Sequence, residues 1–354
     1  MTVLQRYLLT HLSLSWLLAA AVLLPLFSFF DLQQELDDVG EGIYQTRDAF
    51  FTTALLLPRR FIQLSPFIAL LGTVIALGRL AVSLELTAMR GAGLSPLQIG
   101  RAPVMLGLVY IIAIALTDQF IAPVLQQKAI AEQNLGKGLS AELGKNLGIW
   151  TRDTQQIVRI GAMAHSTLAK DIEIFRFNPE GWLETVIQAE RADMSAGQVW
   201  QLQNVTVRSF SDQGLSIADH DTMSWSSFMQ PQQITTLTKP PESLSPLELL
   251  HHINFLKATE QPAQAFILTL WRKPGSALLT LALLLLSLLF VFGSVRRGIA
   301  NQLVITTLLG IGIYVLDQII ANLGLLFEIN AVLVAFLPGL SLLALAYILL
   351  RRLR

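Results

Sequence analysis

Residues 274–295 read PGSALLTLALLLLSLLFVFGSV, a long run without a charged side chain. A helix of about 20 such residues is long enough to cross the hydrocarbon core of a bilayer. The whole chain shares this bias, since 53% of its 354 residues are apolar and 14% are charged, against about 25% charged residues in typical soluble domains. So few charges cannot cover a soluble surface, and the composition therefore predicts a membrane protein.

Five other stretches reach a similar length, so six spans are predicted. No small-residue cleavage pattern follows the first of them, which favours an uncleaved anchor over a signal peptide. With six spans, both termini lie on the same side of the membrane. The predicted spans are Leu12–Phe30, Phe61–Gly78, Ala102–Pro123, Pro274–Val295, Gly298–Asn322 and Ile329–Leu350.

Basic residues gather on the side of the termini. The short segments there contain no lysine, and Glu85 is their only acid. Short loops rich in Lys and Arg stay in the cytoplasm, so we expect both termini to be cytoplasmic. The arginines on this side are Arg6, Arg79, Arg90, Arg101, Arg296, Arg297, Arg351, Arg352 and Arg354.

A polar insert, residues 124–273, separates three spans in residues 1–123 from three in residues 274–354. Its short β-prone runs and turn residues predict an all-β, jellyroll-like domain of seven or eight strands on the outer side. One run changes its apolar phase near Gln203-Asn204, which predicts a bulge or turn, and Asp219-His220-Asp221 is interpreted as a hairpin tip. The expected strands are Ile149–Arg152, Gln156–Ile160, Asp171–Phe177, Leu183–Arg191, Val199–Phe210, Leu215–Ala218 and Met223–Phe228.

An amphipathic helix is expected near the end of the insert, over about residues 246–257. Ser245-Pro246-Leu247-Glu248 is a capping box with proline at the first helical position. His251 and His252 are interpreted as surface residues, because adjacent positions on a helix point in different directions. The apolar face is expected to carry Leu249, Leu250, Ile253 and Leu256.

The sequence carries no pattern for catalysis or cofactor binding. It has no phosphate loop of the G-x-x-x-x-G-K-[ST] type, no H-E-x-x-H and no G-x-S-x-G. The lack of cysteine excludes thiolate metal sites and cysteine nucleophiles, and a net charge of zero gives no reason to expect a nucleic-acid partner. We therefore expect no enzyme, no metal and no cofactor, with any ATP hydrolysis supplied by a separate protein.

Two acids lie within the predicted spans, Asp118 and Asp317, and each is followed by glutamine. Ionisable groups at membrane depth are candidates for function. Both lie toward the outer ends of their spans, so water access or a helix–helix hydrogen bond competes with a proton relay. Asp317-Gln318 is the stronger functional candidate, because Gly310 and Gly312 in the same span suit close or shifting helix packing.

The loop between the second and third spans predicts a short helix over Glu85–Arg90. Glycines at 91 and 93 end it, and Ser95-Pro96-Leu97-Gln98 is a capping box that starts the next helix. A short helix held between two spans can dock into the groove of a partner, where Glu85 is available to an arginine. The alternative is a solvated interfacial loop.

This loop also carries a family resemblance. Residues 72–93, GTVIALGRLAVSLELTAMRGAG, resemble the lipopolysaccharide export permeases of the LptF/LptG family through Ser83, Glu85, Leu86, Met89, Arg90 and Gly93. The resemblance extends over the whole chain and is closer to the LptG branch than to the LptF branch, mainly through the motif Tyr314-Val315-Leu316-Asp317-Gln318. Further matches are Pro58-Arg59-Arg60 and Leu337-Pro338.

The resemblance implies six membrane helices with an inserted periplasmic jellyroll, in the inner membrane of a Gram-negative bacterium. It implies a heterodimer with an LptF-like permease, on a cytoplasmic LptB-like ATPase dimer. The coupling helix, about residues 83–93, would dock there through Glu85, Leu86, Met89 and Arg90. Lipopolysaccharide would leave a cavity between the first and fifth spans and pass to a periplasmic bridge with a membrane-anchored, LptC-like protein.

One departure from the family concerns the outer end of the first span, where family members often place basic residues near lipid A phosphates. This chain has Asp31, Glu35, Asp37, Asp38 and Glu41 instead. Arg59 and Arg60 are the replacements considered, with membrane-interface anchoring as the alternative.

The insert has apolar residues for a lipid groove between sheets, and an ordinary closed sandwich that docks partners is the alternative. The expected groove residues are Ile172, Ile174, Phe175, Phe177, Val186, Trp200, Leu202, Val205 and Val207.

Two other functions compete. A lipoprotein-releasing or other mechanotransmission permease also works with an ATPase, but it typically has fewer spans and a larger outer domain. A proton-coupled carrier would use Asp118 and Asp317, but no span has a charge in its middle.

Overall fold

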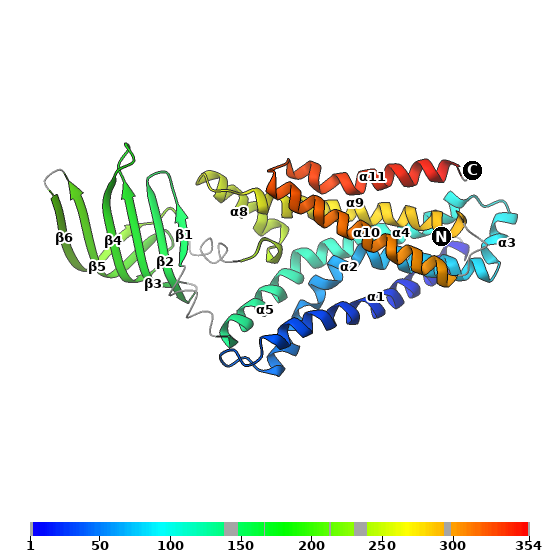
Figure 1. Ribbon diagram of the computed structural model, residues 1–354, viewed down its shortest axis with the longest axis horizontal. Helices are drawn as coiled ribbons and strands as arrows, with labels where there is room; N and C mark the ends of the chain where they lie inside the picture. The colour runs from blue at the N-terminus through cyan, green and yellow to red at the C-terminus, as the bar shows by residue number, and fades with distance from the viewer. Residues whose placement is uncertain are drawn as a thin grey trace.

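The computed structural model describes residues 3–137, 148–165, 167–211, 214–229, 239–293 and 299–352. Within these ranges, six helices are long and apolar enough to cross a membrane, which confirms the six predicted spans. They pack side by side in one bundle, and a β-sheet projects beyond one end of it (Figure 1). The six helices are α1 (Val3–Asp37), α2 (Thr46–Val82), α4 (Pro96–Phe120), α9 (Gln264–Gly293), α10 (Ile299–Leu326) and α11 (Ala331–Arg352).

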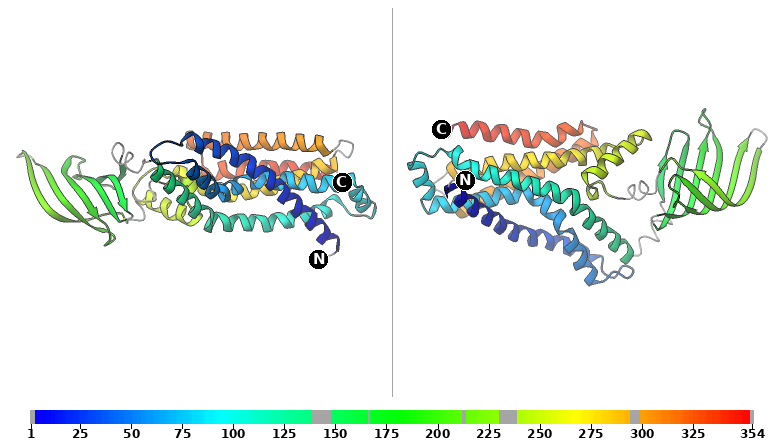
Figure 2. Two further views of the ribbon diagram at one scale, coloured as in Figure 1. Left: turned by 90° about the horizontal axis from the view of Figure 1, so that it is seen from below. Right: turned by 180° about the vertical axis from the view of Figure 1, so that it is seen from behind.

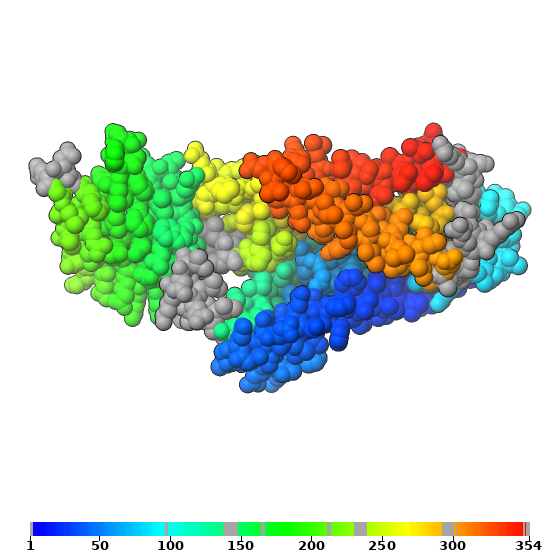
Figure 3. Space-filling model, viewed as in Figure 1, coloured from blue at the N-terminus to red at the C-terminus, as the bar shows by residue number. Residues whose placement is uncertain are grey.

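Both ends of the chain lie at the end of the bundle that is remote from the sheet (Figures 1 and 2). The short helix α3 (Glu85–Gly91) lies at this same end. The space-filling view shows the elongated outline that results, with α1 in blue along one edge of the bundle, α11 in red along the other and α10 in orange between them (Figure 3).

Several helices extend beyond the predicted spans. Helix α2 begins at Thr46 rather than near Phe61, and α9 begins at Gln264 rather than at Pro274. Helix α5 (Ala122–Gly136) occupies the first part of the insert, so the described strands fill only residues 149–226. Hydropathy detects the stretch that lipid requires to be apolar, and these extensions are more polar, so they escaped detection.

The insert forms one antiparallel sheet in which the described strands follow each other in chain order. We predicted seven or eight strands, and the described residues contain six. The two strands expected at Leu215–Ala218 and Met223–Phe228 are wrong, because one continuous strand runs from Gly214 to Ser226. The strands are β1 (Ile149–Arg152), β2 (Gln156–His165), β3 (Leu168–Phe177), β4 (Leu183–Asp193), β5 (Val199–Ser211) and β6 (Gly214–Ser226).

The hairpin tip expected at Asp219-His220-Asp221 is likewise wrong. These residues lie in the middle of β6, where Asp219 pairs with Thr206 and His220 with Val205. Backbone pairing with the long strand β5 keeps these three residues extended. Strand β6 forms an edge of the described sheet.

The predicted change of apolar phase in β5 is present, and Asn204 produces it with a φ of 53°. Leu202 pairs with Ala192 and Val205 with Ala189, so the register is the same on both sides and no residue is inserted. Asp171 on β3 has a similar φ of 54°. A left-handed residue within the continuous strand therefore stands where a bulge or turn was expected, and it turns the next side chains to the other face.

Candidate functional site

Helix α3 lies where the sequence predicted the coupling helix. Leu84 precedes it with a φ of 63°, a left-handed conformation that is unfavourable for a residue with a side chain. Gly93 has a φ of 91° just after the helix. The predicted capping box at Ser95 is confirmed, since its side chain accepts from the backbone N–H of Gln98 and the Gln98 side chain accepts from that of Ser95. Turns at both ends therefore fix α3 between α2 and α4.

The carboxylate of Glu85 is held by two hydroxyl groups of the same chain. The Oη of Tyr7, on α1, donates to Oε2 at 2.7 Å, and the Oγ of Ser83 donates to Oε1 at 2.9 Å. These hydrogen bonds, the one from Tyr7 above all, hold the pKa of Glu85 below its ordinary value. The carboxylate is therefore charged at neutral pH and ready for a further donor.

The other predicted coupling residues divide into two groups. Leu86 is 4% exposed and packs with Leu8 of α1 in one apolar cluster. Met89 packs against the same cluster, while Arg90 is exposed. Leu86 and Met89 therefore anchor α3 to its own bundle, and Glu85 and Arg90 are the members of the set with polar groups available to a partner.

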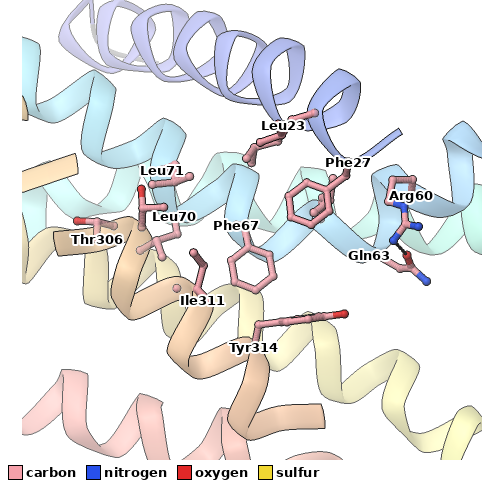
Figure 4. A pocket seen from close by; sticks show the side chains of 14 residues that line it. Leu23, Phe27, Arg60, Gln63, Phe67, Leu70, Leu71, Thr306, Ile311 and Tyr314 are labelled. Atoms are coloured by element: carbon pink, nitrogen blue, oxygen red, sulfur yellow. Dashed lines mark hydrogen bonds between the residues drawn. The ribbon is translucent and has the colours of Figure 1, made fainter. Parts of the chain in front are cut away.

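A largely apolar pocket of about 200 Å³ lies between α1, α2 and α10 (Figure 4). Leu23 and Phe27 of α1 face Phe67 of α2 and Tyr314 of α10 across it. Arg60 and Gln63 lie at one end, where Arg60 donates to Gln63 Oε1 at 2.9 Å. Apolar walls with one charged corner suit an amphiphilic ligand.

The acids near the sheet-side end of α1 are bound to groups of the same chain. Asp31 forms an ion pair with Arg60 of α2, in which Arg60 Nε donates to Asp31 Oδ2 at 2.8 Å. Glu35 accepts from the hydroxyl of Tyr44 at 2.8 Å, and Asp38 forms an ion pair with Lys137. These three acids therefore tie the end of α1 to α2, to the segment just before α2 and to the end of α5.

A second cavity, of about 700 Å³, lies between α2, α4, α9 and α10, with α8 (Pro246–Ala258) at its rim. Asp118 is 6% exposed in its wall. Its Oδ2 accepts from Lys273 at 2.6 Å, and its Oδ1 lies 3.6 Å from Arg59 Nη1. Asp317 accepts from Arg272 at 2.5 Å. Each of these two acids is thus ion-paired with a basic residue of another helix, which agrees with the predicted helix–helix interaction. Gln318 lines the same cavity.

On the sheet, four of the predicted groove residues share one buried face. Ile172, Ile174, Trp200 and Leu202 are each at most 1% exposed and pack in one core. Phe255 and Leu256 of α8 belong to the same core. The inward face is therefore filled in this conformation and would have to open to admit an acyl chain.

The placement of Phe175 on that face is wrong. It follows Ile174 directly, and successive side chains of a strand point to opposite faces. Phe175 stacks on the exposed Trp150 with ring centroids 6.2 Å apart, and Val186 lies opposite it in the register. Phe177 lies beyond a register shift at the end of β3 and is not among the described residues of the core. Val205 belongs to the core, and Val207 packs against it.

Helix α8 starts at the predicted capping box, but two of its residues lie on unexpected faces. Leu250 is 44% exposed and lines the larger cavity. His252 is buried between Phe255 and Phe266, so its surface assignment is wrong. Residue 252 is three positions after Leu249 and four before Leu256, and this spacing puts it on the buried face. Burial lowers the pKa of His252.

The family model for the lipopolysaccharide export system permeases LptF/LptG matches residues 6–352. The chain belongs to this family. A lipopolysaccharide export system permease protein LptG from Haemophilus influenzae is 29% identical over 94% of this chain and 93% of its own length. A protein of the same name from Escherichia coli K12 is 26% identical over 96% of this chain and 95% of its own length.

These relatives confirm the predicted resemblance, including its closer likeness to LptG. Six membrane helices with a sheet inserted after the third agree with the family, so the predicted fold class is confirmed. The chain is accordingly a multi-pass permease of the inner-membrane lipopolysaccharide export system. Among the described residues, no three His, Cys, Asp or Glu side chains gather in a way that could hold a metal ion.

Three groups that shape these sites were not predicted. Lys273 and Arg272 are the partners of the two intramembrane acids, and Tyr7 is the partner of Glu85. Arg272 and Lys273 stand directly before the predicted fourth span, and cations at such a depth are expected to pair with acids of other spans. Tyr7 gave no signal, because 78 residues separate it from Glu85.

Proposed function

We propose that this permease is the LptG-type half of an ATP-driven exporter, which extracts lipopolysaccharide from the inner membrane and passes it to a periplasmic β-jellyroll bridge. One observation carries the proposal. Helix α1 shares an apolar cluster with Leu86 of α3 through Leu8 and Leu12, and it forms a wall of the apolar pocket through Leu23 and Phe27. The same helix thus joins the surface offered to a motor with the surface offered to a lipid.

A second permease is needed to complete the lipid site. The pocket of about 200 Å³ is smaller than the roughly 300–1,000 Å³ that sites for drug-sized ligands occupy, and a lipid with several acyl chains is larger still. An LptF-like partner facing α1 and α10 would supply the missing wall. Such an arrangement makes the transporter a heterodimer with the lipid between the first and fifth spans of each subunit.

The motor is a separate cytoplasmic ATPase dimer of the LptB type. The sequence contains no phosphate loop of its own. Helix α3 lies at the same end of the bundle as both termini (Figure 1), and the arginines of this end favour the cytoplasm. Glu85 and Arg90 make the polar contacts to the ATPase, while Leu86 and Met89 keep α3 rigid against its own bundle.

Of the two arginines considered for lipid phosphates, Arg60 is the better candidate. It lines the pocket between α1 and α10, and its pairing with Asp31 leaves it partly exposed. Arg59 lines the other cavity, where it is mostly buried and faces Asp118. We therefore assign the phosphate contact to Arg60 and a structural role to Arg59.

The sheet is the outlet on the periplasmic side. Its edge strand β6 is suited to pair with a strand of another β-domain, as a bridge containing an LptC-like protein requires. Lipid passes along the face of Ile172, Ile174, Trp200 and Leu202 once that face opens. If this face of the sheet does not open, the domain serves only as a docking site for partner proteins.

Affinity purification of the tagged chain from membranes of a Gram-negative host tests the proposal. The expected co-purifying components are an ATPase, a second permease and lipopolysaccharide, with ATP turnover by the complex but none by the isolated chain. Turnover by the isolated chain, or a stable complex that lacks an ATPase, would contradict it.

A further inference from the structure

The cytoplasmic end of α1 is joined to α3 by one polar contact and one apolar cluster. The polar contact is the hydrogen bond of 2.7 Å from Tyr7 Oη to Glu85 Oε2. The apolar cluster contains Leu8, Leu12 and Leu86. The cluster already places Leu86 of α3 with Leu8 and Leu12 of α1, so the hydroxyl of Tyr7 adds a specific polar contact to this packing.

The role of this contact follows from the carboxylate that Tyr7 holds. An ionised carboxylate has about four acceptor positions, and Tyr7 and Ser83 occupy one on each oxygen. A free glutamate side chain samples several rotamers, and ordering it on docking costs free energy. Two donors from the same chain fix the carboxylate beforehand and leave an acceptor position on each oxygen for a cationic donor of the partner.

The position of Tyr7 adds a mechanical consequence. Tyr7 and Leu23 lie 16 positions apart on one continuous helix, which is about 24 Å at 1.5 Å per residue. Leu23 and Phe27 line the apolar pocket. A displacement of α3 that is passed to α1 at Tyr7 therefore moves a wall of the pocket.

We propose that Tyr7 is a positioning residue, which orients Glu85 for the ATPase and ties the first span to the coupling helix. This inference rests on the proposed function, since it requires that Glu85 be the docking contact. It predicts that the hydroxyl of Tyr7 affects the efficiency of coupling rather than the amount of folded transporter.

Tyr7→Phe removes only this hydroxyl. It is compared with the unaltered chain and with Glu85→Ala, singly and combined, in the purified intact complex. Tyr347→Phe is the matched control, because Tyr347 is an exposed tyrosine near the same end of the bundle. The readout is lipopolysaccharide discharged per ATP hydrolysed, followed with a photo-crosslinking residue at Phe27. Loss of folded protein lowers discharge and hydrolysis together and leaves this ratio unchanged.

The expected result is a several-fold lower ratio for Tyr7→Phe and no further loss when it is added to Glu85→Ala. If Glu85→Ala lowers coupling while Tyr7→Phe equals the unaltered chain, the role of Tyr7 is wrong and the proposed function stands. Equal losses from Tyr7→Phe in both backgrounds would also overturn it, because Tyr7 would then act without Glu85. Normal coupling in Glu85→Ala would refute the coupling assignment itself.

Discussion

The Nζ of Lys273, on α9, lies 2.6 Å from the Oδ2 of Asp118, on α4. Arg59 of α2 lies on the other oxygen of the same carboxylate, at 3.6 Å. Three helices thus meet at one almost fully buried acid. An acid held by two cations has a structural explanation, and a proton relay is not needed to account for it.

Asp118→Ala is expected to destabilise the membrane bundle by about 3–5 kcal/mol, because it leaves a buried cation without its partner. The measurement is the thermal unfolding of the detergent-solubilised chain. Asp118→Ala combined with Lys273→Met should recover part of the loss, since it removes the stranded lysine. A stable Asp118→Ala chain whose transport fails only at particular pH values would instead favour a proton relay.

The left-handed residue in β5 gives a separate prediction for the sheet. Asn204→Val should cost about 1–2 kcal/mol, because a side chain on Cβ is unfavourable at a φ of 53°. Asn204→Gly keeps that conformation accessible and should stay close to the unaltered chain. Hydrogen exchange of the β4 and β5 amides reports the difference. Equal protection in the two variants would mean that the strand can change phase without this residue.

Packing of α8 on the sheet is expected to depend on pH through His252. Burial lowers its pKa in the folded chain, while the unfolded value is about 6.5. The unfolded state therefore binds more protons, so stability falls as the pH drops below about 6.5 and is restored above it. After correction for intrinsic rates, amide hydrogen exchange over residues 246–258 should be faster at about pH 5.5 than at about pH 7.5.

His252→Leu should abolish that pH dependence, whereas substitution of its exposed neighbour, His251→Gln, should preserve it. If the unaltered chain and the His252→Leu variant responded to pH in the same way, the effect would belong to other titratable groups.

Lipid passage along the sheet is tested by pairs of neighbouring residues. Photo-crosslinkers at Ile174 and Leu202 replace buried side chains. Those at Glu173 and Gln201 replace side chains that bond to other strands on the opposite face. The inward pair should capture lipopolysaccharide only when ATP is present, because that face has to open. Equal capture at both pairs, or at neither, would make the domain a docking module.

The sequence predicted the parts of this fold that depend on local chemistry. The apolar spans follow from the demands of lipid, and the caps at Ser95 and Ser245 follow from side chains three residues apart. The phase change at Asn204 was detectable because alternation along a strand is regular. These features depend on residues that are neighbours in the chain.

What escaped prediction depends on residues that only the folded chain brings together. The pairs Asp31–Arg60 and Asp118–Lys273 join different helices, with 29 and 155 positions between the paired residues. Asp219-His220-Asp221 has the composition of a turn, and only its pairing with β5 keeps it in a strand. Strict alternation should have excluded Phe175 from the face of Ile174, so that error lay in the interpretation.

ATP is expected to drive lipopolysaccharide out of the pocket between α1 and α10. A photo-crosslinking residue at Phe27, in the wall of the pocket, tests it most directly in the reconstituted complex. Ile112 on α4 is the control, since it is 61% exposed and lines neither cavity. We predict capture of lipopolysaccharide at Phe27 that ATP reduces several-fold, with little capture at Ile112. Capture that is equal at the two positions, or that ATP leaves unchanged at Phe27, would contradict the claim.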